Sequence, residues 1–384
     1  MRDGNWIDGR REPAAEGGLF EPALRSGGGH RREPWPRSDG ADLEWALGSL
    51  GSAGPSWRGL SARDRRACLL DRLDAWQRRA PGVDELAERL GLGHDALDEE
   101  LELALHAGDR ILDGGGGRGE SGIVLVRVPA SELWERALAE VLRPLLAGAS
   151  VLVLSDPDLP WVMDELLRAL VEPDPEHPLA GAVALLHGDR PGLVQEALRG
   201  GGLSRAWLGG LEVEAHGTPV QGHGPRGASE VVLRGEDPAE RAVEVLEAAF
   251  GPARALGGQR AGHTARVFCH ERHLSGFTDA LLEGLDAAPR EGRCRPFVSD
   301  LGRRCGALVR LGLDEGATLL RSGPEGRSGF RGGSRDASLW PSVFTNVEPQ
   351  LTLARATEPA PVLSLVRAAD DDTAQALAGR ADDR

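Results

Sequence analysis

The stretch that decides the fold is "GIVLVRVPASELWERALAEVLRPLLAGASVLVLS", residues 122–155. Both of its ends are short, nearly continuous apolar runs, which predict strands buried on both faces. Between the two runs, apolar residues recur at intervals of three and four, which predicts an amphipathic helix. A strand, a helix and a second strand of these lengths make a βαβ unit, in which the two strands run parallel.

The same alternation of strand and helix continues on the C-terminal side of this unit and begins again near residue 229. The predicted strands cover residues 181–188, 204–210, 229–235 and 263–269, and the predicted helices cover 160–172, 191–200, 237–251 and 274–288. Strands separated by helices of this length predict doubly wound α/β sheets. On the N-terminal side, residues 5–24 predict a hairpin-like start and residues 43–112 have helical periodicity.

The length and order of these elements predict two domains. Residues 1–225 are expected to form a Rossmann-like domain with a helical N-terminal region, and residues 226–384 a second, C-terminally truncated α/β domain. The segment 26–40 has the glycine, proline and charged composition of a loop.

The charge balance excludes some classes of protein. The 384 residues include 45 Lys and Arg and 60 Asp and Glu, a net charge of −15. An acidic chain argues against a general nucleic-acid or anionic-membrane surface, because both require a positive field. The sequence contains no lysine and no tyrosine, so a Schiff-base lysine, a P-loop lysine and a tyrosine acid are excluded.

The ends of the chain and its cysteines indicate the compartment. The N-terminal "MRDGNWIDGRREP" has no signal-peptide hydrophobic region, and no apolar run is long enough to span a bilayer. Cys68, Cys269, Cys294 and Cys305 lack the paired spacing of metal ligands. We therefore expect reduced thiols and a cytoplasmic location.

Six segments, in order, resemble the NAD(P)-dependent aldehyde dehydrogenase superfamily, and they are distributed over nearly the whole chain, although the resemblance omits the family's C-terminal end. They are "NWIDGRR" (5–11), "GIVLVRVPASELW" (122–134), "LLAGASVLVLSDPDLP" (145–160), "GLSRAWLGGLEV" (202–213), "GGQRAGHTARVF" (257–268) and "VEPQLTLARATEPAPVLSLV" (347–366). The resemblance implies an aldehyde dehydrogenase-like fold, a Rossmann-type parallel-sheet domain followed by the second α/β domain.

The resemblance also implies a reaction and the residues that would perform it. In the family a cysteine thiolate attacks the aldehyde, an asparagine and a backbone N–H hold the oxyanion, and a glutamate activates water. The cysteine's position falls on Ala261 and the asparagine's on Ser131. The glutamate's position falls on Gln221, or on Gly224 in a gapless match. None of these side chains can perform the family's role.

The cofactor-binding positions are changed as well. The lysine that holds the ribose falls on Leu154, and the glutamate near it on Pro157. The glutamate of the motif "EEIFGP" falls on Thr357, and the phenylalanine that steadies the nicotinamide on Pro359. The glycine that approaches the pyrophosphate is retained as Gly209.

These losses favour a catalytically inactive homologue, a pseudoenzyme, with no bound cofactor. Removal of a nucleophile alone costs on the order of a millionfold in rate. The chain resembles the non-catalytic second module of the family's two-module members, family 16. We therefore expect a structural or assembly role, with an active aldehyde dehydrogenase chain or a second copy of itself as the partner, and neither nucleic acid nor membrane as one.

Two other functions remain open. The first is an active aldehyde dehydrogenase that uses NAD or NADP and oxidises an aldehyde to a carboxylic acid, with Cys269 or another thiol as nucleophile. The second is a DNA-binding regulator, because "VDELAERLGLGHDALDEEL" (83–101) resembles a helix-turn-helix. Its second helix would present Asp95, Asp98, Glu99 and Glu100, which repel phosphate.

Smaller motifs receive structural interpretations. "CHERH" (269–273) would place Cys269 and His270 on opposite faces of a strand, which disfavours a metal site. Asp156 and Asp158 in "SDPDLP" are expected to form a turn after a strand. His216 and His223 are expected to be solvated loop residues.

Overall fold

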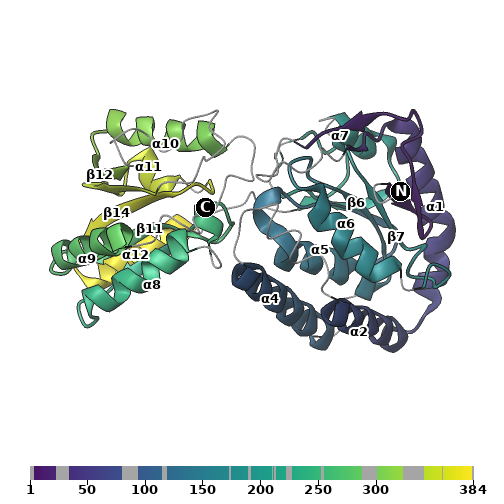
Figure 1. Ribbon diagram of the computed structural model, residues 1–384, viewed down its shortest axis with the longest axis horizontal. Coiled ribbons are helices and arrows are strands. Elements are labelled where there is room, and N and C mark those ends of the chain that lie inside the picture. The colour runs from purple at the N-terminus through teal and green to yellow at the C-terminus, as the bar shows by residue number, and fades with distance from the viewer. Residues whose placement is uncertain are drawn as a thin grey trace. The chain divides into compact units, whose positions relative to one another are not determined.

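The computed structural model shows two compact units. One consists of residues 1–86 and 98–224, and the other of residues 87–97 and 225–384. Figure 1 shows the elements of both, coloured along the chain. The residues that the structure describes are 4–22, 34–79, 94–114, 119–172, 174–188, 192–209, 211, 213–221, 227–251, 255–287, 301–322, 341–356 and 358–382.

The first unit is built on a mixed sheet with a parallel centre. Its strands are β1 (Asn5–Ile7), β2 (Arg10–Glu12), β3 (Leu19–Phe20), β4 (Trp35–Pro36), β5 (Ile123–Arg127), β6 (Ser150–Leu154), β7 (Val183–Leu186), β8 (Leu203–Trp207) and β9 (Val220–Gln221). Its helical elements are α1 (Gly40–Gly59), α2 (Ala62–Arg79), most of α4 (His94–Asp113), the 3-10 turn η1 (Ala130–Glu132), α5 (Leu133–Ala147), α6 (Pro160–Val171) and α7 (Gly192–Gly200).

The predicted βαβ unit is confirmed. Residues 122–155 fold as β5, η1, α5 and β6, and β5 pairs with β6 in parallel, with Val124 opposite Val151. The strand order β2-β1-β7-β6-β5-β8-β9 places β5 between β6 and β8. The chain therefore winds from β5 through β6 to β7 in one direction and then returns to β8 on the other side, as in a doubly wound sheet.

Two parts of this sheet differ from a purely parallel arrangement. The hairpin-like start is confirmed as β1 and β2, and β1 also pairs antiparallel with β7, with Trp6 opposite Leu185. At the other edge, β9 joins β8 in parallel through the segment 208–219, whose described residues contain no helix. The sequence pattern predicted neither the pairing of β1 with β7 nor strand β9. The pairing joins residues that are far apart along the chain, and β9 is too short to give a periodic pattern.

The core of the first unit lies on both faces of the sheet. Alternate residues of β5, β6 and β7, including Leu125, Leu152 and Leu186, pack against α1 and α7. On the other face Trp134 of α5 meets Trp76 of α2 edge to face, with ring centroids 5.5 Å apart. In the described part of the chain, no helix is both long and apolar enough to span a bilayer.

The second unit contains a smaller sheet in the order β10-β11-β14-β13-β12, in which only β12 runs antiparallel to its neighbour. Its strands are β10 (Ala228–Val232), β11 (Thr264–His270), β12 (Thr318–Ser322), β13 (Ser342–Thr345) and β14 (Val362–Ala368). Its helical elements are α8 (Pro238–Phe250), the 3-10 turn η2 (Leu256–Gly258), α9 (Leu274–Ala287), α10 (Leu301–Asp314), α11 (Thr352–Arg355) and α12 (Asp371–Asp382).

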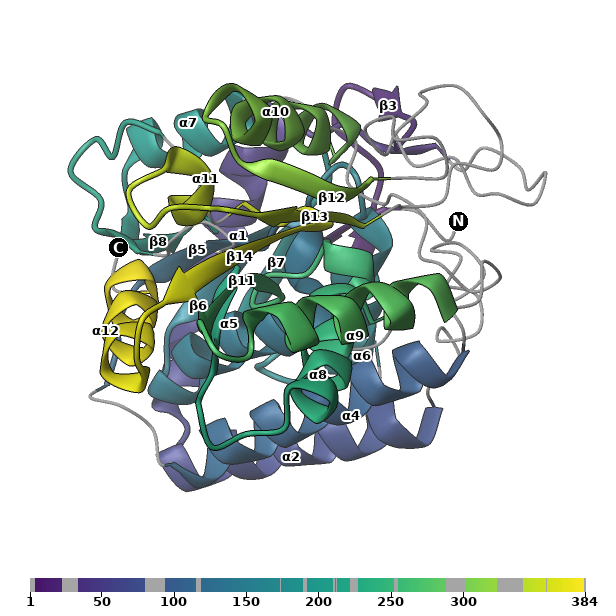
Figure 2. The same cartoon turned by 90° about the vertical axis from the view of Figure 1, so that its left-hand side faces the viewer.

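Helices cover both faces of this sheet as well. Phe277 and Leu281 of α9 share a core with Val267 and Leu365, on the face that α8 and α9 cover. Helices α10 and α11 lie on the opposite face, as Figure 2 shows. The α/β architecture predicted for the second domain is therefore confirmed within the described residues.

Candidate functional site

The carboxyl edge of the first sheet carries most of the family positions. Ligands of open α/β sheets bind outside the carboxyl ends of the strands, at the point where the winding reverses. Here that point lies between β5 and β8. The positions that follow or end strands at this edge are Ser131 after β5, Leu154 and Pro157 at the end of β6, Gly209 after β8, and Gln221 at the end of β9.

The ribose position Leu154 is buried, and the carboxylate near it is bonded within the protein. Leu154 is 3% exposed, and its side chain lies in the apolar core with Leu152 and Leu193. The carboxylate beside it, Asp156, accepts a hydrogen bond from Arg127 Nη2 at 3.1 Å and one from the backbone N–H of Ala130 at 3.3 Å. This carboxylate therefore holds the β5 and β6 ends together.

The pyrophosphate position is occupied by protein atoms. Gly209 has φ +55°, and a Cβ on it would lie 2.4 Å from Cδ of Pro129. The glycine therefore admits the close approach of the Pro129 ring. A helix N-terminus binds anions through its unpaired N–H groups, but the described residues between β8 and β9 contain no helix. The segment after Gly209 therefore supplies no helix N-terminus in its described part.

The oxyanion and general-base positions also differ in environment. Ser131 is 4% exposed, within the 3-10 turn η1. Gln221 is exposed on β9, and its Oε1 accepts a hydrogen bond from Arg205 Nη1 at 3.1 Å. An amide at this position cannot take a proton as a carboxylate would.

The nucleophile position lies in the second unit, in the loop between η2 and β11. Ala261 is half-buried there. Gly258 (φ +85°), at the end of η2, lies close to the segment before β14, since a Cβ on it would lie 2.7 Å from Cα of Pro361. Pro359 is buried in that same segment, and Thr357 lies outside the described residues. The fold thus brings Ala261 and Pro359 to the amino ends of the adjacent strands β11 and β14.

A buried histidine fixes the end of this loop. His263 is 1% exposed, and its Nδ1 lies 2.8 Å from the carbonyl oxygen of Arg260. Burial lowers the pKa of His263 to about 4, so the ring is neutral at physiological pH. Its own carbonyl accepts the N–H of Ala228 at 2.8 Å, which ties the loop to β10.

The candidate replacement thiol is not activated. Cys269 is fully buried in the core between the sheet and α9. Burial raises the pKa of its thiol to about 12. Cys68, on α2, is half-buried with its Sγ 3.6 Å from His177 Nδ1, and burial raises its pKa too. The thiolate is the nucleophilic form, so neither cysteine is prepared for attack. Cys305 is buried, and Cys294 lies outside the described residues.

The turn at Asp156 and the buried Cys269 agree with the expectations from the sequence. Asp156 Oδ1 accepts the N–H of Asp158 at 3.0 Å, which confirms the turn after β6. His273 donates to the carbonyl of Arg234 at 2.8 Å, and Cys269 faces the core. Within the described ranges, no group of three or more His, Cys, Asp or Glu side chains could hold a metal ion. His216 lies in a loop 3.6 Å from Glu214, and His223 falls outside the description.

The helix-turn-helix interpretation is unsupported. Residues 83–93 lie outside the described part, and residues 94–101 begin α4. Glu100 is fully buried, and its Oε1 accepts the N–H groups of Trp134 and Glu135, each at 3.1 Å. It therefore caps the N-terminus of α5, where two N–H groups need a partner. The helix proposed to bind DNA therefore packs against α5 with the face that carries Glu100.

A buried polar network escaped prediction from the sequence. Ser155 Oγ lies 2.9 Å from His187 Nδ1, and His187 Nε2 lies 3.8 Å from Asp164 Oδ1. Although burial opposes ionisation, the neighbouring His187 and Arg11 side chains lower the pKa of Asp164. One feature of the sequence could have indicated this network. Ser155 and His187 directly follow β6 and β7, which are adjacent parallel strands.

The residue types of this network are those of a hydrolytic triad, but their burial favours a structural role. Ser155 is 4% exposed and His187 is fully buried. A nucleophile needs access to its substrate. The network instead ties β6, β7 and α6 to the N-terminal hairpin, because Asp164 also accepts Trp6 Nε1 at 3.0 Å and Arg11 Nη2 at 2.8 Å.

Comparisons with known proteins agree with the fold. No family model matches the sequence. A curated relative, malonate-semialdehyde dehydrogenase 1 of Geobacillus kaustophilus, is 32% identical over 167 residues, which are 42% of this chain and 33% of that protein. The match thus spans a third of the relative's length.

Solved structures match over nearly the whole length. The NAD-dependent benzaldehyde dehydrogenase of Corynebacterium glutamicum superposes with a TM-score of 0.83 at 17% identity, over 98% of this chain and 87% of that one. The salicylaldehyde dehydrogenase of Pseudomonas putida, solved with salicylaldehyde, gives 0.80 at 16% identity, over 99% and 82%. The chain has the fold of the aldehyde dehydrogenase superfamily, as its six motifs predicted.

Proposed function

We propose that this chain is a catalytically silent homologue of the aldehyde dehydrogenases with a structural role in an assembly. The observation that carries the proposal is the state of its thiols. The nucleophile position is Ala261, and the nearest cysteine along the chain, Cys269, is buried with a pKa of about 12. Without a thiolate the family's first step, attack on the aldehyde carbon, has no nucleophile.

The proposal extends to the cofactor. The residues at the carboxyl edge of the first sheet do not fit a dinucleotide: Leu154 lies in the core, Asp156 is bonded to Arg127, and the Pro129 ring lies against Gly209. Residues that hold ribose and pyrophosphate normally offer free hydrogen-bonding groups. We therefore expect neither NAD nor NADP to bind at this edge.

The partner in the proposal is a chain of the same fold, either an active aldehyde dehydrogenase or a second copy. The resemblance to the non-catalytic module of the two-module family members supports this choice. The acidic charge, −15, disfavours nucleic acid. The free thiols of Cys68, Cys269 and Cys305 support a cytoplasmic location.

One observation favours an active enzyme as the second candidate. The relative that is 32% identical over 167 residues is named as a dehydrogenase of malonate semialdehyde. In this alternative NAD or NADP binds, and a thiol such as Cys269 becomes accessible when it does.

Calorimetry and a turnover assay separate the two candidates. NAD+ and NADP+ are titrated into the chain, and reduced cofactor is followed with malonate semialdehyde, benzaldehyde and salicylaldehyde. We expect no heat and no turnover. Saturable turnover that Cys269→Ala abolishes would overturn the silent assignment, and Cys305→Ala is the matched thiol control.

The assembly role needs its own measurement. The tagged chain is co-expressed with the aldehyde dehydrogenases of its source and the mass of the purified complex is determined by light scattering. A defined stoichiometric complex or a homo-oligomer is expected. A monodisperse monomer that co-purifies with none of them would contradict the assembly role while leaving the catalytic result intact.

A further inference from the structure

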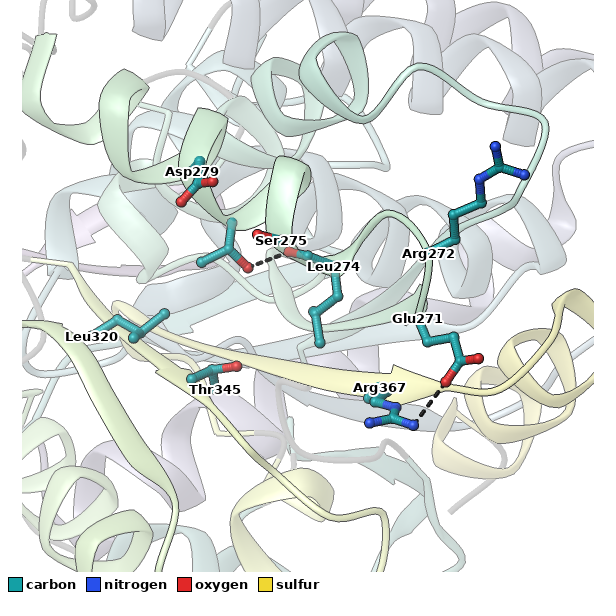
Figure 3. Close-up of a pocket in the computed structure, with 9 residues that line it drawn as sticks. Glu271, Arg272, Leu274, Ser275, Asp279, Leu320, Thr345 and Arg367 are labelled. Atoms are coloured by element: carbon teal, nitrogen blue, oxygen red, sulfur yellow. Dashed lines mark hydrogen bonds and ion pairs between the residues drawn. The ribbon is translucent and has the colours of Figure 1, made fainter.

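A pocket in the second unit lies at the opposite end of its sheet from the family positions Ala261 and Pro359. It has a volume of about 550 Å³ and lies between α9 and the carboxyl ends of β11, β14 and β13 (Figure 3). Such a volume is within the usual range for small-molecule sites. Ala261 precedes the amino end of β11, whereas the pocket residue Glu271 follows its carboxyl end, and the seven residues of the strand span about 20 Å.

The charges of the pocket are arranged in one pair and two single groups. Glu271, after β11, binds Arg367 of β14 at 2.7 Å, so these two neutralise each other. Within the described residues, the Arg272 guanidinium and the Asp279 carboxylate make neither a hydrogen bond nor an ion pair with protein. The pocket therefore offers one cation and one anion to a ligand.

These two groups lie at separate ends of the pocket. Figure 3 shows Asp279 on α9 and Arg272 in the turn before that helix, with Leu274 between them. From Leu274 to Asp279 the helix rises about 7.5 Å, and the turn adds to this distance. A molecule that reaches both groups must separate its own charges by several bonds.

The surface between the charges suits a short methylene chain. Leu274 and Leu320 supply apolar surface from α9 and β12. The Thr278 hydroxyl donates to the Leu274 carbonyl at 2.6 Å, so its oxygen is left as an acceptor.

From this arrangement we propose that the pocket binds a linear ω-amino acid, with its ammonium group at Asp279 and its carboxylate at Arg272. The methylenes lie over Leu274 and Leu320. Because the Arg272 and Asp279 side chains are both exposed, each ionic contact contributes little to the binding free energy. The expected Kd is on the order of a millimolar.

The test uses the whole chain and three probes in ligand-observed NMR titrations: 6-aminohexanoate, hexanoate and hexylamine. The zwitterion is expected to bind up to about fivefold more tightly than either singly charged probe, since each ionic contact is worth up to about 1 kcal/mol. Asp279→Asn should reduce 6-aminohexanoate to the affinity of hexanoate, and Arg272→Gln to that of hexylamine.

Glu283→Gln, an exposed position one turn farther along α9, is the matched control and should change none of the three affinities. Equal affinity for all three probes, or an unchanged affinity in both pocket variants, would overturn the proposal. The result is independent of the proposed function, because it involves neither dinucleotide nor aldehyde. Since Arg272, Asp279 and Glu283 are all exposed, thermal melts should show that each variant folds.

Discussion

Arg127 at the end of β5 donates a hydrogen bond of 3.1 Å to Asp156, which follows the adjacent strand β6. The two side chains are 19% and 11% exposed. The pair lies at the edge of the sheet where a doubly wound fold usually binds its ligand. A carboxylate at this edge is thus used to hold the protein together.

Asp156→Ala tests this structural role. It removes the partner of Arg127 and of the Ala130 and Asp158 N–H groups, and should lower the free energy of unfolding by about 2–4 kcal/mol. Urea denaturation measures the change. The exposed pair of Arg66 with Asp113 is the control, and Asp113→Ala should cost less than about 1 kcal/mol. Equal losses in the two variants would show that the Asp156 pair is no stronger than a surface pair.

Gly209→Ala tests the close approach of Pro129. The new Cβ would lie 2.4 Å from Pro129 Cδ at φ +55°, so we expect a loss of about 2–4 kcal/mol from strain and steric overlap together. Gly217 has φ +84°, but a Cβ at this position would have no neighbouring atom within 4 Å. Gly217→Ala should therefore cost only the backbone strain, about 1–2 kcal/mol. Thermal melts measure both changes. If Gly209→Ala and Gly217→Ala lower the stability equally, Pro129 does not restrict the residue at position 209.

Glu100→Ala tests the cap of α5. The change leaves the N–H groups of Trp134 and Glu135 without their carboxylate partner, and should cost about 1–3 kcal/mol. Glu102→Ala, at an exposed position of the same helix, should be nearly neutral. Chemical denaturation measures both. A neutral Glu100→Ala would mean that the end of α5 finds other partners.

Cys269 is expected to resist alkylation in the native state. Burial keeps its pKa at about 12, so at pH 7.5 the thiolate population is negligible and access requires unfolding. Iodoacetamide labelling followed by peptide mass mapping should find Cys269 modified only after denaturant is added. Cys68, which is half-buried, should label faster than Cys269. Rapid native labelling of Cys269 would favour the active-enzyme alternative.

His263 should make stability depend on acid pH. Its folded pKa, about 4, is below the ordinary value of 6.5, so the unfolded chain binds a proton first as the pH falls. The free energy of unfolding should therefore drop between pH 6.5 and 4, by about 3 kcal/mol from this group. His263→Gln should flatten that part of the curve, whereas His106→Gln, at an exposed position, should not. Parallel curves for both variants would exclude His263 as the cause.

The family positions show how much of the candidate site could be predicted from the sequence. The identities at Ala261, Gln221 and Leu154 already indicate that no thiol, carboxylate or amine stands at the family's working positions. Their surroundings could not be predicted. That Leu154 belongs to the core, and that Asp156 is bonded to Arg127, follows from the packing of neighbouring strands.

The sequence by itself determined the alternation of strands and helices, including β5, α5 and β6, because hydrophobic periodicity is a local property of the chain. Only the tertiary structure decided that Trp6 pairs opposite Leu185, that Glu100 caps α5, and that Ser155, His187 and Asp164 meet. These contacts join residues that are far apart along the chain. Their partners are selected by strand register and by the need to satisfy buried polar groups, which local sequence patterns do not encode.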